Sequence, residues 1–454
     1  MYRKNAWKKY GDDVKDVMAF AEDYKGYISF GKTERLVTKE SVELLKANGF
    51  VDASTVKELK AGSKVYFVNK NKNVAAYIIG KKPLLEGMRI LGAHIDSPRL
   101  DFKERPLYEN REFAYGDTHY YGGIKKYQWV TIPLALHGVI CKKDGSSVEV
   151  NIGEDPTDPV VGISDLLIHL AADQMQKSLA KGIEGENLDV TLGNMPLKDG
   201  EKDAVKANVL RILKEKYDVE EEDLLSAEIE VVPAGPARDY GLDRSMIAGY
   251  GHDDRCCAFS SLRAILDIEN PEYTACCILV DKEEIGSVGA TGAASVFFEN
   301  TVAKLFQKLG DNHPLMAVRE CFENSKMLSS DVSAGFDPLY AYVSDPNNNA
   351  YFANGIVINK YTGRGGKGGS NDANPEYYAF IRKAFDEADV YWQNSELGKV
   401  DQGGGGTIAY ILGNYNMNVI DAGIPVHNMH APMEIISKVD LYEAYLGYKA
   451  FLLA

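Results

Sequence analysis

The chain has 454 residues, 45% hydrophobic and 26% charged, a composition typical of a globular protein that folds into more than one domain. Its formal net charge of −15 excludes nucleic acid as the main partner, because no basic surplus exists to neutralise phosphates. No window approaches the ~18 uninterrupted apolar residues of a bilayer span, so no membrane partner is expected. The first residues lack the apolar core of a secretory signal. The two adjacent cysteine pairs lack zinc-finger spacing, and six cysteines are few for a disulfide framework, so we expect a cytoplasmic protein.

The first hundred residues predict an α/β fold. Residues 12–50 alternate apolar and charged side chains at helical spacing, which indicates two helices. Two strand-like runs, 63–69 and 73–80, are separated by the turn "KNK" and predict a hairpin. Another apolar run, 88–96, is a predicted strand with a polar end.

The pattern changes after about Phe102. The runs 129–141 and 147–153 predict strands, and helices are predicted at 165–180 and 201–217. Alternation of strands and helices resumes at about residue 234 and continues to the end. We therefore predict a catalytic α/β domain made of residues 1–101 and 234–454, interrupted by an inserted β-rich domain at 102–233.

Acidic residues and histidines gather where predicted strands end. Glu283 and Glu284 are adjacent and follow the buried run 275–280. The other candidates in similar positions are His94, Asp96, Asp253, Asp254, Asp331 and His430. Because an α/β sheet brings the carboxyl ends of its strands to one edge, these side chains can meet there.

Carboxylates and imidazoles together suit zinc and similar divalent ions. Five ligands are too many for one tetrahedral zinc with an open site, but they suit two ions that share a carboxylate. Each motif alone has an ordinary explanation, such as helix capping by the "DD" of 253–254 or a solvated turn at the "EE" of 283–284. Their order along the chain distinguishes the two interpretations.

In that order, "GAHIDSPRLD", "DKEEIGSVGATGA", "SSDVSAG", "DQGGGGTIA" and "MHAPMEI" resemble the dinuclear metallo-aminopeptidases of the aminopeptidase I and aspartyl aminopeptidase family. The resemblance covers nearly the whole chain and includes "FGKTERLV" (30–37), "YYGG" (120–123) and "DLLIHLA" (165–171). It implies a mixed-sheet α/β/α metallopeptidase domain interrupted by a β-rich dimerisation domain. It also implies a soluble cytoplasmic hydrolase that acts on peptides.

The resemblance assigns a role to each candidate residue. One divalent ion would be held by His94, Asp253 and Asp331. The second would be held by Asp253, Glu284 and His430, so that Asp253 bridges the two. Glu283 would be the general base for a metal-bridged water, and Asp96 would orient the ring of His94. Zinc is the expected metal, with cobalt or manganese as the alternatives.

In two departures from the family pattern the chain resembles the bacterial aminopeptidase I branch more than the aspartyl branch. Ala334 and Asp337 stand where many relatives carry histidines, and Asn359 and Lys360 are shifted by one position relative to the aspartyl branch. We therefore expect release of neutral or hydrophobic N-terminal residues. The alternatives are an aminopeptidase specific for aspartyl or glutamyl residues, and a non-enzymatic relative that only forms a shell.

The resemblance also predicts a homo-oligomer, a tetrahedral dodecamer built through the insert. His169 in "DLLIHLA" resembles the family histidine that the insert offers to a neighbouring subunit's active site. An equally open interpretation is a helix histidine buried in an interface.

Overall fold

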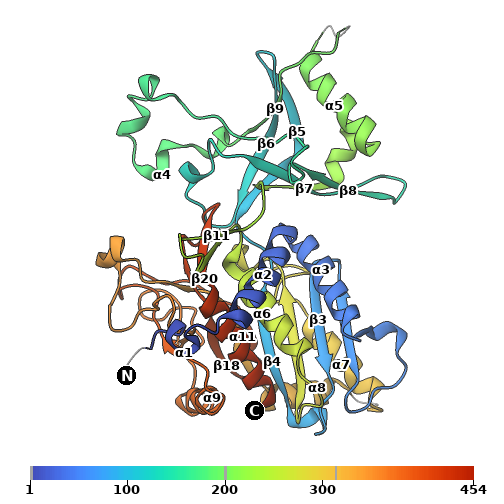
Figure 1. The fold of residues 1–454 in the computed structure, drawn as a ribbon. Coiled ribbons are helices and arrows are strands. Elements are labelled where there is room, and N and C mark those ends of the chain that lie inside the picture. The colour runs from blue at the N-terminus through green and yellow to red at the C-terminus, as the bar shows by residue number, and fades with distance from the viewer. Residues whose placement is uncertain (1–3, 199–201, 312–313) are drawn as a thin grey trace. The chain divides into compact units, whose positions relative to one another are not determined.

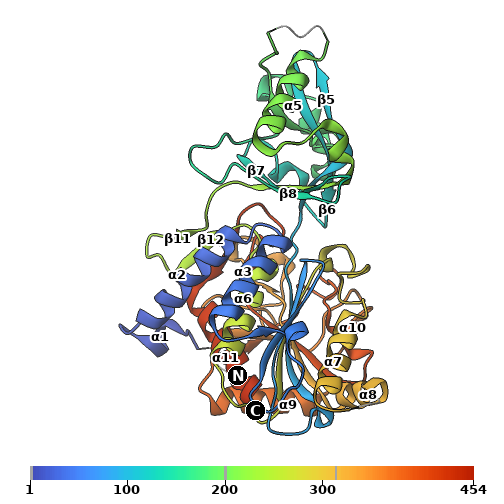
Figure 2. The same ribbon diagram turned by 90° about the vertical axis from the view of Figure 1, so that its right-hand side faces the viewer.

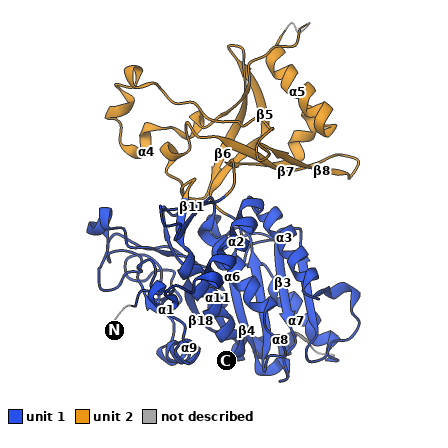
Figure 3. Ribbon diagram, viewed as in Figure 1, with its two compact units in different colours: residues 1–96, 237–429, 434–454 blue, residues 97–236, 430–433 orange. Residues whose placement is uncertain are grey.

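The computed structural model describes residues 4–198, 202–311 and 314–454 (Figure 1). Their contacts divide the chain into two compact units (Figure 3). Unit 1 comprises Met1–Asp96, Ala237–Met429 and Glu434–Ala454, and unit 2 comprises Ser97–Pro236 and His430–Met433. Helices and mixed sheets are both substantial, which confirms the predicted α/β class. The division into a catalytic and an inserted functional domain, at 101/102 and 233/234, stays a prediction.

Unit 1 is built on a nine-stranded mixed sheet. In sheet order the strands are β1 (Val51–Asp52), β2 (Lys64–Asn69), β3 (Asn73–Ile78), β13 (Thr274–Val280), β4 (Met88–His94), β14 (Lys326–Ser329), β18 (Asn418–Gly423), β16 (Ile356–Asn359) and β17 (Trp392–Asn394). Strands β13, β4, β14 and β18 are mutually parallel. On one side of this group β3 runs antiparallel to β13, and on the other side β16 runs antiparallel to β18. The four parallel strands therefore end at one edge of the sheet.

Both faces of this sheet are buried, and the side chains of β13 show how. Ala275, Cys277 and Leu279 belong to the apolar core on one face, and the alternate residues Cys276 and Ile278 belong to the core on the other. This period of two explains why β13 reads as a continuous apolar run instead of alternating with polar residues.

Helices cover the two faces as separate layers (Figure 2). One layer contains α2 (Lys15–Phe30), α3 (Glu34–Ala47), α6 (His252–Leu266), α9 (Pro375–Glu387) and α11 (Lys438–Leu453). The other contains α7 (Phe297–Lys308), α8 (Pro314–Asn324) and α10 (Ala409–Gly413). The short α1 (Trp7–Tyr10) precedes α2.

A second, five-stranded sheet completes unit 1. Its order is β11 (Arg238–Tyr240), β12 (Met246–Gly249), β20 (Glu434–Ser437), β19 (Pro425–His427) and β15 (Ser333–Ala334). Strand β12 leads into α6, and β15 follows β14 closely in the chain, so this sheet constrains two of the segments that carry candidate ligands.

Unit 2 contains an antiparallel six-stranded sheet. Its order is β8 (Ser147–Ile152), β7 (Leu134–Cys141), β10 (Ala227–Pro233), β5 (Arg99–Asn110), β6 (Phe113–Tyr121) and β9 (Val190–Gly193). The helix α5 (Ala204–Tyr217) belongs to the same unit and agrees with the predicted helix at 201–217, whose first residue lies outside the described ones.

The helix predicted at 165–180 is wrong. The segment forms two short 3-10 turns, Ile168–Leu170 and Gln174–Gln176, followed by the single-turn α4 (Leu179–Gly182). Its large apolar side chains are exposed, so no packed surface in the described chain stabilises an amphipathic helix here. The strand predicted at 129–141 likewise begins only at Leu134, after Thr131 adopts a positive φ of 61°.

The described residues include no helix that is both long enough and apolar enough to cross a membrane.

Candidate metal centre

Three parallel strands deliver candidate ligands to one edge of the large sheet. His94 is the last residue of β4, where it pairs with Val280 at the end of β13. Glu283 and Glu284 lie in the 3-10 turn Glu283–Ile285 directly after β13, and Asp331 follows β14 by two residues. Sequence reasoning placed these side chains at one edge, and the structure brings them together there.

The fourth segment is the start of α6. Asp253 and Asp254 depart from helical φ and ψ angles, and the peptide bond between them is cis. Both side chains are buried. The backbone N–H of Asp253 donates to Oε2 of Glu434 at 3.0 Å, which ties the helix start to β20.

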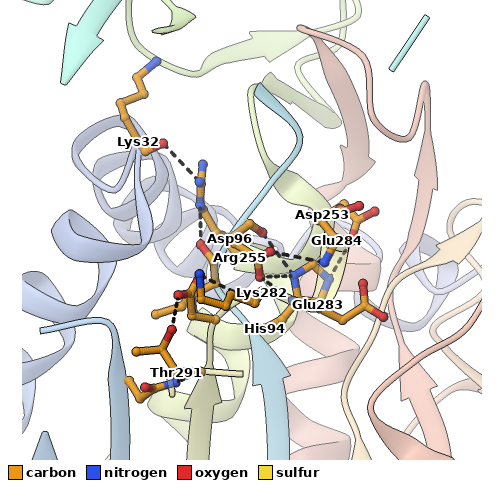
Figure 4. Close-up of polar contacts among 12 residues, drawn as sticks. Lys32, His94, Asp96, Asp253, Arg255, Lys282, Glu283, Glu284 and Thr291 are labelled. Carbon is orange, nitrogen blue, oxygen red and sulfur yellow. Dashed lines mark hydrogen bonds and ion pairs between the residues drawn. The ribbon is translucent and has the colours of Figure 1, made fainter. Parts of the chain in front are cut away.

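Two groups of possible ligands share His94. In the first, ligand atoms of His94, Asp253 and Glu284 lie within 4.8 Å of one another, with His94 Nε2 3.1 Å from Asp253 Oδ1 (Figure 4). In the second, ligand atoms of His94, Asp254 and Asp331 lie within the same distance of one another. The sequence assigned Asp254 no ligand role; its position in the "DD" pair was the available signal.

His430 belongs to unit 2. There its Nδ1 lies 2.8 Å from the backbone oxygen of Gly123, which can only accept, so the ring donates through Nδ1 and keeps Nε2 as its acceptor atom. His169 also lies in unit 2, in the exposed 3-10 turn Ile168–Leu170.

Asp96 contacts both the backbone of the two glutamates and the ring of His94. Its Oδ1 and Oδ2 accept the backbone N–H groups of Glu283 and Glu284 at 3.1 and 3.2 Å. Nδ1 of His94 lies 3.0 Å from the backbone oxygen of Asp96 and 3.4 Å from its Oδ1. Because these oxygens are acceptors, the imidazole donates through Nδ1 and directs Nε2 towards Asp253, the arrangement that metal-bound histidines commonly need.

The electrostatics of this site favour the binding of a cation. Burial raises the pKa of Asp331 well above its ordinary value, and the nearby carboxylates of Asp253 and Glu283 add to the effect, although His94 opposes it. Burial also raises the pKa of Asp254, again with a contribution from Asp331. Burial lowers the pKa of His94, but hydrogen bonds to Asp253 and Asp96 outweigh it and hold that pKa well above its usual range.

Such a concentration of buried acids is unfavourable unless a positive charge neutralises it. Oxygen donors combined with an imidazole nitrogen are ligands that zinc accepts. The residues present therefore fit a divalent metal.

The comparisons with known proteins agree with this chemistry. Residues 27–452 match the profile of the family described as Aminopeptidase I zinc metalloprotease (M18). A relative from Clostridium acetobutylicum, named probable M18 family aminopeptidase 1, is 56% identical over 99% of this chain and 98% of its own length.

Solved structures give the same result. The crystal structure of an M18 aminopeptidase from Thermotoga maritima superposes with a TM-score of 0.96 at 44% identity, covering 100% of this chain and 99% of that one. Aminopeptidase I from Clostridium acetobutylicum gives a TM-score of 0.92 at 54% identity, covering 100% and 99%.

The fold and the buried donor set are those of a metallopeptidase. The chain belongs to the aminopeptidase I zinc metalloprotease (M18) family, in its bacterial aminopeptidase I branch. It is a hydrolase that removes N-terminal residues from peptides, so the predictions of an enzyme and of this activity are confirmed.

Proposed function

We propose that the enzyme binds two divalent ions, zinc in both positions, and that they share Asp253. His94 and Asp331 would complete the ligands of one ion, and Glu284 and His430 would complete those of the other. The observation that carries this proposal is the group in which the buried His94 and Asp253 and the half-buried Glu284 offer ligand atoms within 4.8 Å of one another. Asp254, which approaches His94 and Asp331, is an additional candidate for the first ion.

Divalent ions bound here would polarise the scissile carbonyl and make water a stronger acid. The chain's own contribution is proton transfer by Glu283. This half-buried carboxylate takes a proton from the attacking water and delivers it to the departing amine, as a general base and then a general acid. Asp96 holds the ring of His94 and the backbone of both glutamates, so the acid–base group and two ligands are positioned by one side chain.

For specificity we propose neutral or hydrophobic N-terminal residues. The support is the sequence of the third-ligand segment, where Ala334 and Asp337 replace the histidines of many relatives, and the similarity to relatives named aminopeptidase 1. Preference for aspartyl or glutamyl residues is the alternative.

We further propose that the enzyme works in the cytoplasm as a homo-oligomer, a tetrahedral dodecamer assembled through the inserted segment. All six cysteines are free thiols, as expected in a reducing compartment. Exposed apolar side chains between Leu166 and Leu179 supply an assembly surface. A yeast protein that shares the fold at 19% identity is described as the mApe1 dodecamer. His169, exposed on that surface, would reach the active site of a neighbouring subunit.

The test is hydrolysis of aminoacyl-p-nitroanilides of Leu, Met, Ala, Lys, Asp and Glu by chelator-treated enzyme, after zinc, cobalt or manganese is added back separately. We expect no activity after chelation and recovery with zinc, with Leu and Met cleaved faster than Asp and Glu. Metal titration that reaches full activity at one ion per chain would contradict the dinuclear assignment. A faster rate on Asp or Glu would contradict only the proposed specificity.

A further inference from the structure

The two active-site glutamates stand on a loop whose ends are joined by one buried pair of side chains. The loop leaves β13 at Asp281 and returns at Thr291. Oγ1 of Thr291 donates to Oδ2 of Asp281 at 2.6 Å, and the backbone N–H of Asp281 donates to the backbone oxygen of Thr291 at 3.2 Å. Asp281 is 1% exposed and Thr291 4% exposed, so water does not compete for these bonds.

The second oxygen of Asp281 begins a series of three contacts. Its Oδ1 accepts the backbone N–H of Lys282 at 2.8 Å. The next two N–H groups, those of Glu283 and Glu284, donate to the two oxygens of Asp96. Three consecutive backbone N–H groups are thus directed at two buried carboxylates (Figure 4). This fixes the backbone at Glu283 and, with it, the direction in which its side chain leaves.

The conformation of Lys282 makes these contacts necessary. Its φ of 69° lies in the left-handed region, which costs an L residue about 1 kcal/mol or more unless surrounding contacts hold it. The Lys282 N–H bond to Asp281 is one of the contacts that hold it, beside the backbone oxygen of Lys282, which accepts the N–H groups of Ser287 at 2.7 Å and Ile285 at 3.3 Å. The Thr291 hydroxyl in turn holds Asp281.

The far end of the loop is tied to the β2–β3 hairpin. Nδ2 of Asn73 donates to the backbone oxygen of Thr291, and Nδ2 of Asn69 donates to that of Ala290 at 2.8 Å. These bonds fix the position of Thr291 relative to the hairpin, and the hydrogen bond from its hydroxyl then fixes the position of the Asp281 carboxylate.

We propose that Asp281 and Thr291 are positioning residues for Glu283. The Thr291 hydroxyl holds the Asp281 carboxylate, which sets the turn at Lys282 and so places the Glu283 carboxylate for proton transfer. This inference rests on the proposed role of Glu283 as the acid–base group. Neither residue touches substrate or metal in this scheme, so their effect is expected in turnover instead of in substrate affinity.

The test compares Thr291→Val, which keeps the shape and removes the hydroxyl, with Thr291→Ser, which keeps the hydroxyl. We expect Thr291→Val to lower kcat about tenfold or more, because small misplacement of a catalytic group is costly, with KM within about twofold of the wild type. Zinc content should not change, and Thr291→Ser should restore kcat to within about twofold.

Thr301→Val is the matched control. Thr301 is also buried and lies in the helix α7, outside the loop. Its Oγ1 lies 2.6 Å from the hydroxyl of Tyr77. Its removal should lower the melting temperature without changing kcat.

Three results would overturn the proposal. One is a Thr291→Val enzyme with wild-type kcat. Another is a Thr291→Ser enzyme as slow as Thr291→Val, which would remove the hydroxyl from the argument. The third is a Thr291→Val enzyme that loses zinc and recovers full kcat when zinc is added. Asp281 and Thr291 would then position only the ligand Glu284. None of these would affect the role of Glu283 itself, which a separate variant tests below.

Discussion

At the scale of single residues, the carboxylates near the centre divide into two kinds. Asp253 and Glu284 offer oxygens that lie within 4.8 Å of each other and of a ring nitrogen of His94, and Asp331 does so with Asp254 in a second group that shares His94. Asp96 and Glu434 instead accept backbone N–H groups of the ligand-bearing segments. Backbone N–H groups hold such a carboxylate in one orientation, so the second kind gives the first its geometry.

Glu283 is neither a proposed metal ligand nor an acceptor of backbone N–H groups in this scheme, so Glu283→Gln is expected to change proton transfer alone. The amide keeps the size of the side chain but cannot take a proton from water. We expect kcat to fall by about 10²- to 10⁴-fold, the usual contribution of a general acid–base group, while zinc content stays at the wild-type value. Steady-state kinetics and metal analysis of the same preparation measure both quantities.

Glu299→Gln on α7 is the control, because Glu299 is half-buried like Glu283 but lies outside the turn. A Glu283→Gln enzyme that keeps near wild-type turnover would remove Glu283 from the acid–base role.

The sequence indicated the candidate ligands and Glu283 better than it indicated the backbone contacts of Asp96 and Glu434. His94, Glu283 and Glu284 were recognisable because each ends a predicted strand within a short motif. Asp96 is 187 residues from Glu283 in the chain, and Glu434 is 181 residues from Asp253. Neither backbone contact follows from local spacing, because it depends on how distant strands meet.

At the scale of elements, prediction succeeded where burial follows a regular period. The β2–β3 hairpin forms at the predicted place, with Asn69 paired to Asn73 across the turn. The helices at 15–30 and 34–47 also agree with the spacing of their apolar residues. The segment 165–180 has enough apolar residues for a helix but none of the packing within the described chain that would stabilise one, and a helix pattern without a partner surface is weak evidence.

The first turn of the helix α11 contains a buried acid that makes the free energy of unfolding depend on pH. Asp440, in its first turn, accepts the backbone N–H groups of Ala353 and Gly355 at 2.6 and 2.7 Å. Burial raises the pKa of Asp440 from 3.8 to about 8, although these hydrogen bonds oppose the rise. Between these values the folded state holds one proton that the unfolded chain has released. The stabilisation from Asp440 is therefore complete below pH 3.8 and is lost as pH rises towards 8.

For Asp440→Asn we expect the free energy of unfolding to become less dependent on pH in this window. The slope should change by about 1.4 kcal/mol per pH unit, the contribution of one proton. Urea unfolding at several pH values between about 5 and 8 measures it.

Asp239→Asn is the control for this experiment. Lys25 and Lys438 hold the pKa of Asp239 at about 2, so it titrates below the window in both states. Equal slopes for the wild type and Asp440→Asn would show that Asp440 is already ionised in the folded protein.

At the scale of the whole molecule, the segment 165–180, where the predicted helix does not form, carries a run of exposed apolar side chains. Leu166, Leu167, Ile168 and Leu170 are each between 53% and 69% exposed. Met175 and Leu179, further along the same segment, are exposed to 69% and 67%. Patches of this kind mark interfaces between proteins, and the packing that this segment lacks within one chain can come from another copy.

Leu170→Glu tests this assignment, because a charge within an apolar interface opposes association. We expect sedimentation to show particles smaller than those of the wild type. Aminopeptidase activity should fall with the particle size, because each active site would lose the His169 of a neighbouring subunit. Ile212→Glu, on the exposed side of α5 in the same unit, introduces the same charge and should change neither quantity.

An unchanged particle mass for Leu170→Glu would show that the assembly surface lies elsewhere on the chain. Smaller particles with undiminished activity would show that each chain carries a complete site, and His169 would then have no catalytic part.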